Sequence, residues 1–139
     1  MNIEGRTLHP GHGEGDLLVL REPLSFWGGL DLKTGVIIDQ SHPEVGQSLA
    51  GRIVAMPGSR GSSGTPGVLG EALRLGVGPA ALVVTKADVN LIAGVIVAEA
   101  LYGVNCPILQ VAPHEMPPHG VADRCTIMAQ RQDWSAVDD

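Results

Sequence analysis

The pattern of hydrophobic and polar positions divides the chain into two unlike halves. In the second half, short apolar runs typical of buried strands alternate with stretches that have helical spacing. The predicted strands are residues 52–56, 80–85, 106–111 and 123–129, and the predicted helices are residues 66–75 and 89–101. Strands that alternate with helices indicate a parallel sheet with right-handed crossovers.

The ends of both helices have recognisable signals. Thr65 before Pro66 is typical of an N-cap followed by proline at the first helical position, and Asp88 is a candidate N-cap of the second helix. Gly76 and Gly103 are the expected stops. The second helix is apolar on nearly every side but only about 13 residues long, which predicts a buried core helix instead of a membrane span.

Glycine and proline interrupt the first half, which has the character of short antiparallel strands. The predicted strands there are residues 2–8, 16–20 and 35–39, and the predicted loops are residues 9–15 and 39–46. Residues 24–31 combine Phe26, Trp27, a glycine pair and Asp31, and form either a packed loop or the wall of a pocket. The expected fold is a single α/β domain over residues 1–139, with a β-rich N-terminal half packed on a three-layer half with parallel crossovers.

A turn rich in glycine and serine, residues 56–71, follows the strand at residues 52–56 and precedes the first helix. Glycines allow backbone N–H groups to approach a ligand, and the positive end of a helix favours an anion. The turn matches neither a Walker loop, nor a dinucleotide fingerprint, nor a G-x-S-x-G nucleophile elbow. By its pattern alone it is either an anion site or a structural strand-to-helix loop.

Charge and composition exclude several functions. The net charge of -6 and the lack of any lysine or arginine cluster argue against a nucleic-acid partner. No signal peptide and no apolar run of about 18 residues is present, so we expect a cytosolic protein without membrane contact. Cys106 and Cys125 are too few for a zinc or iron-sulfur site within this chain and are expected to be buried thiols. His9 and His12 are interpreted as turn residues rather than metal ligands.

Several multi-residue motifs occur in order between about Glu4 and Val111. They are residues 24–31, Thr34-Gly35, Ile38-Asp39, His42-Pro43, Gly46, Leu49, Gly51-Arg52-Ile53, Pro57, Arg60-Gly61-Ser62-Ser63, Glu71, Pro79-Ala80-Ala81, Gly94, Val97-Ala98-Glu99 and Leu101-Tyr102-Gly103. Together, these motifs resemble the small subunit, or swivel domain, of the aconitase X family. The family's usual serine-rich continuation is replaced here by Thr65-Pro66-Gly67.

The resemblance implies a swivelling β/β/α domain that works with a large subunit carrying an iron centre or iron-sulfur cluster, with no cofactor in this chain. Members of the family are hydro-lyases that dehydrate cis-3-hydroxy-L-proline or 5-phosphomevalonate, and the family's catalytic serine falls on Ser62. The acidic charge and the scattered basic residues favour the amino acid as substrate. The candidate site consists of Ser62 as base and, for substrate binding, Arg60, Gly61, Ser63, Trp27, Asp31 and His42.

Elementary chemistry agrees with this assignment and leaves two other functions open. A serine hydroxyl becomes a usable base only where N–H donors and a cation stabilise its alkoxide, and Arg60 with the helix start could supply both. Arginine also binds a carboxylate at two points. The alternatives are a non-catalytic docking domain, expected to expose an apolar face around Phe26 and Trp27, and a free-standing anion-binding module.

Overall fold

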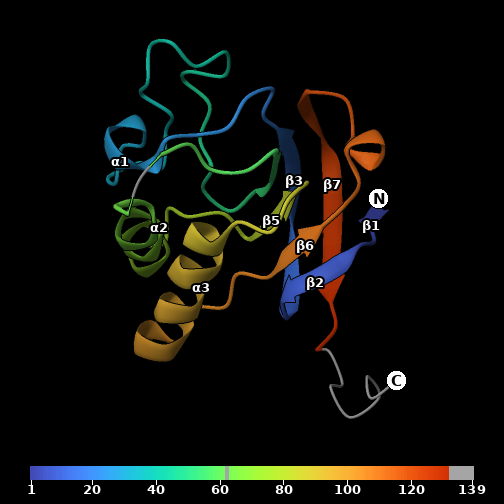
Figure 1. The fold of residues 1–139 in the computed structure, drawn as a ribbon. Coiled ribbons are helices and arrows are strands. Elements are labelled where there is room, and N and C mark those ends of the chain that lie inside the picture. The colour runs from blue at the N-terminus through green and yellow to red at the C-terminus, as the bar shows by residue number, and fades with distance from the viewer. Residues whose placement is uncertain (62, 132–139) are drawn as a thin grey trace.

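The computed structural model describes residues 1–61 and 63–131, and this part of the chain forms one curled seven-stranded sheet (Figure 1). The strand order is β1-β7-β3-β4-β5-β6-β2. The strands are β1 (Asn2–Ile3), β2 (Arg6–His9), β3 (Gly11–Val19), β4 (Ile53–Met56), β5 (Ala81–Val84), β6 (Ile108–Gln110) and β7 (Gly120–Ala129). The helices are the short α1 (Phe26–Gly29), α2 (Thr65–Arg74), α3 (Val89–Tyr102) and the 3-10 turn η1 (Pro113–Glu115).

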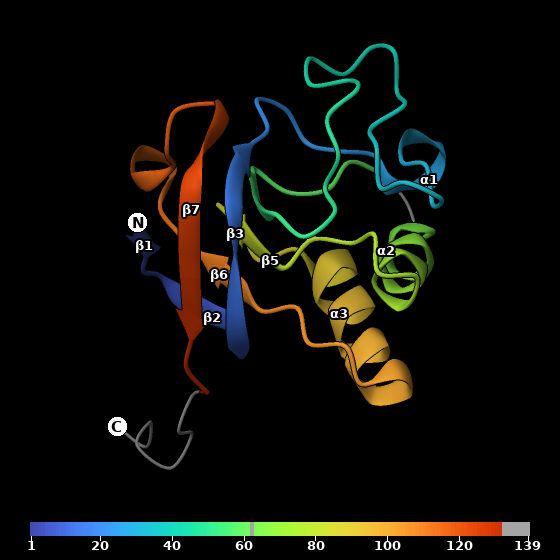
Figure 2. The same cartoon turned by 180° about the vertical axis from the view of Figure 1, so that it is seen from behind.

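The centre of the sheet consists of four parallel strands, β3, β4, β5 and β6. Every residue of β4 and of β5 is buried, as expected for strands covered on both faces. Helices α2 and α3 connect these strands and lie together against one face of the sheet (Figure 2). The predicted α/β class and the parallel crossovers are therefore confirmed.

Alternation along the parallel strands creates two apolar layers. Leu18, Val54 and Leu82 face the helices and the loop that contains Phe26, whereas Leu17, Ile53 and Ala81 face the inside of the curl. Successive side chains of a strand point to opposite faces, so one short apolar run contributes to both layers. The strands of the two halves of the chain share this one sheet, because β7 lies between β1 and β3.

The two edges of the sheet are joined by one short piece of chain. β1 pairs in parallel with β7, and β2 pairs antiparallel with β6 at the other edge. Only Glu4 and Gly5 separate β1 from β2, so the sheet must curl until its edges come close. A Cβ atom at Gly5 would overlap the carbonyl oxygen of Gln110, and only glycine allows this approach.

The predicted loop at residues 9–15 is wrong, because β3 begins at Gly11 and pairs antiparallel with β7. Gly13 and Gly15 are buried, while His12 and Glu14 between them are exposed, which is strand alternation with glycine as the inward residue. A side chain at Gly13 would meet the backbone of Ala80, so these glycines permit close packing of two strands. In the sequence they had indicated a turn.

Two other boundaries differ from expectation. Residues 35–39 form isolated bridges, Leu30↔Ile37 and Val36↔Ser48, within an ordered loop over the core instead of a strand. The N-cap position of α2 belongs to Gly64, with Thr65 as the first helical residue. By contrast, Asp88 caps α3 and Gly103 ends it in a left-handed conformation, as predicted.

No helix within residues 1–61 and 63–131 is long and apolar enough to cross a bilayer. The 24–31 segment separates its two aromatic residues, because Phe26 is fully buried in the core and Trp27 is exposed. A continuous apolar face around both residues, which a docking domain would use, is therefore not formed.

Candidate functional site

The candidate site lies where the parallel strands β3, β4 and β5 end. Their carboxyl ends are at the same edge of the sheet, and the segments that follow them, residues 20–24, 57–61 and 85–88, meet there. In open α/β sheets this edge is the usual place for a ligand.

Asp88 locks the glycine-serine turn to the start of α3. The backbone N–H and the hydroxyl of Ser59 both donate to Oδ2 of Asp88 at 2.7 Å. The other carboxylate oxygen, Oδ1, accepts from the N–H groups of Asn90 and Leu91 at 3.0 and 3.1 Å. One carboxylate thus caps a helix and holds the segment that leads to Arg60.

Arg60 rests on the segment that follows β3. Its backbone N–H donates to the carbonyl of Leu24 at 2.9 Å, and its guanidinium Nη2 lies 3.4 Å from Oε1 of Glu22. Both side chains of this ion pair are about half exposed, so the pair contributes little to stability. The guanidinium can therefore exchange Glu22 for a ligand carboxylate at small cost.

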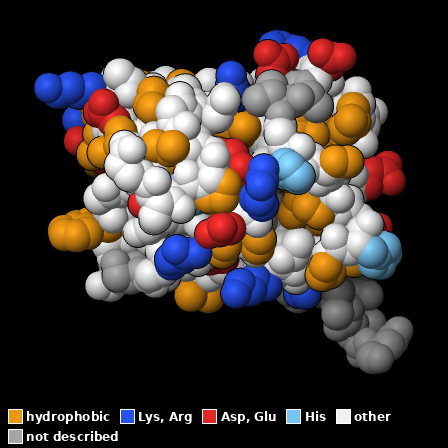
Figure 3. Space-filling model, turned by 90° about the horizontal axis from the view of Figure 1, so that it is seen from above, with side chains coloured by type: hydrophobic (Ala, Val, Ile, Leu, Met, Phe, Trp, Pro, Cys, Tyr) orange, Lys and Arg blue, Asp and Glu red, His pale blue; other side chains and the backbone are white. Residues whose placement is uncertain are grey.

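Asp39 adds a second negative charge near Arg60. Hydrogen bonds from the Ser41 hydroxyl and then from the Ser41 backbone lower the pKa of Asp39, with a smaller contribution from the charge of Arg60. Asp39 is therefore ionised at neutral pH. The face seen from above in Figure 3 shows acidic and basic side chains next to one another, without an area of one sign.

The turn requires glycine at two positions, at one for its backbone conformation and at the other for lack of space. Gly61 adopts a φ of 99°, which glycine tolerates and other residues rarely do. The indole of Trp27 lies across Gly64, where an added Cβ would stand 2.9 Å from Cδ1 of the ring. Trp27 and Ser63 are both exposed at this edge, so the structure brings Arg60, Gly61, Ser63 and Trp27 together.

Ser62, the predicted catalytic base, lies outside the described residues. The next hydroxyl along the turn after Ser63 is that of Thr65, whose Oγ1 is fully buried and has no hydrogen-bond partner among the residues that the structure describes. The N-cap residue of α2, Gly64, has no side chain with which to cap the helix.

His42 is buried against the segment at residues 20–24, and Asp31 lies in a separate turn. The His42 ring is buried, with Nδ1 accepting from the Glu44 N–H at 3.0 Å and Nε2 at 3.1 Å from the Glu22 carbonyl. These partners assign the proton to Nε2. The carboxylate of Asp31 accepts from the Lys33 N–H at 2.9 Å within a turn. Gly35 of this turn packs against Val77, which follows the C-terminal end of α2. Asp31 thus stands apart from the turn.

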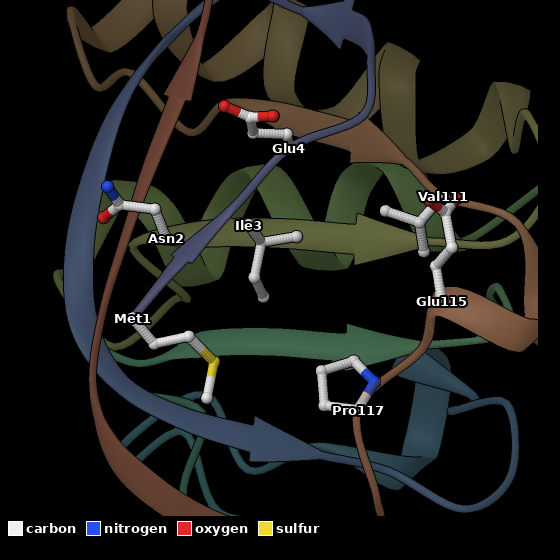
Figure 4. Close-up of a pocket in the computed structure, with 7 residues that line it drawn as sticks. All are labelled: Met1, Asn2, Ile3, Glu4, Val111, Glu115 and Pro117. Carbon is white, nitrogen blue, oxygen red and sulfur yellow. The ribbon is translucent and has the colours of Figure 1, made fainter.

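Two pockets in the described part of the chain are relevant to where a ligand could bind. One of about 380 Å³ opens at the carboxyl edge, between Arg21, Pro57, Thr85 and the segment from Pro113 to His119. Another of about 440 Å³ lies beside β1, and Met1, Ile3 and Pro117 are among the residues that line it (Figure 4). None of the predicted site residues that the structure describes lines either pocket, but Arg21, Pro57 and Thr85 of the first pocket belong to the segments that meet at the candidate site.

The described residues contain no group of three or more histidine, cysteine or acidic side chains that could hold a metal ion. Cys106 and Cys125 are buried on opposite faces of the sheet, Cys106 toward the helices and Cys125 inside the curl. Burial raises the pKa of Cys106 to about 12, which keeps its thiol protonated and poor as a ligand. This part of the chain does not fit an iron centre.

Sequence reasoning missed the residues that support the turn. Ser59, Glu22 and Glu44 have no distinguishing pattern, because their partners lie more than 20 residues away in the chain. Asp88 was recognisable as a helix cap, but its second function depends on a contact with Ser59 that only the fold creates.

The model of the aconitase X swivel domain matches residues 2–133. The cis-3-hydroxy-L-proline dehydratase of Pseudomonas aeruginosa is 45% identical over 106 residues, which are 76% of this chain and 18% of that protein. The chain therefore spans less than a fifth of the length of this relative.

Two further proteins are closer to this chain in length. The phosphomevalonate dehydratase small subunit of Methanothermobacter thermautotrophicus is 38% identical over 98 residues, which are 70% of this chain and 75% of that one. The crystal structure of aconitase X from Thermococcus kodakaraensis, in its holo-form, superposes with a TM-score of 0.74 at 30% identity and covers 87% of this chain and 88% of that one.

Proposed function

The chain belongs to the aconitase X swivel-domain family, and from this premise we propose that it is the small subunit of a two-chain hydro-lyase that dehydrates a hydroxy acid. The observation that supports this most directly is the rigid placement of the Arg60-Gly61 turn at the carboxyl edge of the sheet. Asp88 holds this turn on one side and Leu24 holds it on the other.

Each residue of the turn has a distinct role in the proposal. Ser62 removes the proton next to the substrate carboxylate, and Arg60 binds that carboxylate at two points. The guanidinium also lowers the cost of a negative charge on the serine oxygen, since opposite charges nearby favour the ionised form. Gly61 and Ser63 contribute N–H and hydroxyl donors, and Trp27 covers the turn at Gly64.

The departing hydroxyl requires a Lewis acid, which an iron centre of the large subunit would supply when bound. The described residues of this chain offer no ligand set for it, and we assign it to the partner. On this basis the chain is inactive alone, and its turn completes a site on the large subunit.

The substrate that we favour is cis-3-hydroxy-L-proline. Arg60 is matched by Glu22, and Arg21 lies 3.7 Å from Glu44, so the charges of these two arginines are balanced. Such a site suits the single carboxylate of an amino acid better than a phosphate with a charge of about -2. The 45% identity to a hydroxyproline dehydratase also supports this choice.

Phosphomevalonate is the second candidate, and one observation favours it. The side chain of Lys86 lies beside Gly58, where an added Cβ would be 3.2 Å from the lysine Cε, so a second cation is near the turn. Relatives of similar length are phosphomevalonate dehydratase small subunits.

The first experiment is an assay of the purified chain, alone and co-expressed with an aconitase X large subunit, on both substrates. We expect turnover of cis-3-hydroxy-L-proline only with the partner. Turnover by the chain without its partner would refute the two-chain proposal. If the complex turned over phosphomevalonate but not cis-3-hydroxy-L-proline, phosphomevalonate would become the proposed substrate.

A second experiment tests the serine. In the assembled complex, Ser62→Ala should lower kcat by about 10² or more, the scale of losing a proton-transfer group. Ser48→Ala is the matched control, since its hydroxyl bonds to the Thr34 carbonyl away from the turn, and it should retain activity. Near-normal turnover by Ser62→Ala, with the complex intact, would remove Ser62 from the role of base.

A further inference from the structure

Two buried polar side chains hold the piece of chain on which the Arg60 turn rests. In the described residues, the buried polar or charged side chains are His42, Glu44 and Thr65. The first two belong to the loop at residues 39–46, and both bind to residues 21–24, which follow β3. We call His42 and Glu44 the clamp and residues 21–24 the docking segment.

The clamp binds the docking segment at consecutive residues. Oε1 of Glu44 accepts the Arg21 N–H at 2.7 Å, and Nε2 of His42 donates to the Glu22 carbonyl at 3.1 Å. The two clamp residues are also joined to each other, because the Glu44 N–H donates to Nδ1 of His42 at 3.0 Å. Every polar atom of the imidazole is therefore used to hold backbone.

The docking segment in turn holds Arg60. Leu24 and Ser59 form a parallel bridge, and the Leu24 carbonyl accepts the Arg60 N–H at 2.9 Å. Glu22, whose carbonyl His42 holds, also directs its carboxylate to the Arg60 guanidinium at 3.4 Å. A displacement of Glu22 would thus move the carboxylate that pairs with the Arg60 guanidinium. It would also shift the chain two residues before Leu24, whose carbonyl accepts the Arg60 N–H.

We propose that His42 is a positioning residue for the dehydration, acting through the Glu22 carbonyl to set the docking segment and with it Arg60. This inference rests on the proposed function. Direct contact with substrate is disfavoured, because the residue is only 5% exposed and a new partner would have to break one of its two backbone bonds. Misplacement of a binding group by about 1 Å can cost about 10²-fold in rate, so the clamp matters although it is remote from the reacting atoms.

Two conservative variants separate the bonds of the imidazole. In His42→Asn the short side chain can still accept the Glu44 N–H, as asparagine does two residues along in a turn, but it does not reach the Glu22 carbonyl. In His42→Gln the longer amide can donate to Glu22. In the assembled complex we expect kcat/KM to fall by about 10- to 100-fold in His42→Asn and to stay within about 3-fold of wild type in His42→Gln.

A double mutant tests whether the effect passes through Arg60. With Arg60→Lys already present, the two-point contact is lost, and His42→Asn should lower kcat/KM by less than about 3-fold further. If His42 had a merely structural role, the kcat/KM losses of the two single variants would multiply in the double mutant. Multiplied losses would overturn the proposal. Full activity of His42→Asn in the complex would overturn it as well.

Amide hydrogen exchange in the isolated chain gives a readout that needs no activity. His42→Asn should accelerate exchange of the Arg60 amide by about 10-fold or more, because its acceptor is on the docking segment. The Ser59 amide is the internal control, since Asp88 on α3 holds it and its exchange should stay unchanged. In His42→Gln both amides should exchange as in wild type.

The outcomes distinguish this inference from the proposed function. Selective loosening of Arg60 in His42→Asn supports the positioning role even if the complex turns over neither substrate, a result that would refute only the proposed function. Equal change at both amides, or none, overturns the positioning role even in an active dehydratase. Should His42→Asn fail to fold, loosening of the Arg60 amide in His42→Gln still contradicts the proposal.

Discussion

Cys106 lies fully buried between the sheet and the helices, and this environment alone raises the pKa of its thiol from 9.0 to about 12. In the unfolded chain the same thiol returns to its ordinary value. Between these two values the unfolded state binds fewer protons than the folded state. The free energy of unfolding therefore decreases as the pH rises through this range.

Cys106→Ala should remove this pH dependence. We expect wild type to lose up to about 1.4 kcal/mol of stability per pH unit above pH 9 relative to the variant, in addition to changes that both proteins share. Urea unfolding of both proteins at pH 8, 9 and 10 measures the difference in slope. Parallel curves would mean that the thiol ionises without unfolding and would contradict its burial.

At the same scale, sequence reasoning succeeded where a residue acts through its neighbours in the chain. The N-cap at Asp88 and the helix stop at Gly103 follow from residue type and spacing, and both are present. The function of His42 could not be deduced, because a lone histidine before proline has the same appearance whether its ring is solvated or bound to the backbone of residue 22.

Helices α2 and α3 pack closely because glycines line their contact. An added Cβ at Gly94 would lie 3.1 Å from Cδ2 of Leu69 and 3.2 Å from the carbonyl oxygen of Pro66. Contacts this short force neighbouring atoms to move, and one of them is backbone. The approach of the two helices keeps the start of α2 beside α3, so this packing supports the turn.

Gly94→Ala should destabilise the protein by about 1–3 kcal/mol despite the better helix propensity of alanine. Gly67→Ala is the matched control, because Gly67 is exposed within α2 and an added Cβ would meet nothing within 4 Å. That change should stabilise by about 0.5–1 kcal/mol. Chemical denaturation of both variants measures this, and a stabilised Gly94→Ala would show that the helices are further apart.

Helix and buried-strand patterns predicted the elements from β4 to β6, because amphipathic spacing and apolar runs are local properties. The start of β3 was missed since glycine indicates a turn in isolation, whereas Gly13 and Gly15 serve a close approach to strands that lie far along the chain. At residues 35–39 a β-branched run has strand propensity, yet it finds only isolated bridges.

The curl of the whole sheet depends on the short connection between β1 and β2. β1 belongs to the edge beside β7 and β2 to the edge beside β6, so the four residues from Ile3 to Arg6 span the two ends of the sheet. Ile3 packs on the apolar layer inside the curl, as Figure 4 shows from the side of the pocket. The closure protects the inner layer from water.

Gly5→Ala should disturb this closure. The new methyl group would overlap the carbonyl oxygen of Gln110 on β6, and we expect a loss of about 1–3 kcal/mol together with faster amide exchange in β1 and β2. Glu4→Ala, at the adjacent exposed position, should change stability by less than about 0.5 kcal/mol. Equal stability of the two variants would contradict the proposed importance of the closure.

The sequence by itself determined the α/β class, the crossover helices with the caps of α3, and the position of the glycine-serine turn between a buried strand and a helix. These properties depend on residues within about four positions of one another, where periodicity, capping and turn preference operate. Only the tertiary structure decided that Asp88 holds Ser59, that the docking segment holds Arg60, and that the clamp binds the docking segment. Their hydrogen bonds join residues 20 to 38 positions apart, and such pairs leave no local pattern for sequence reasoning to find.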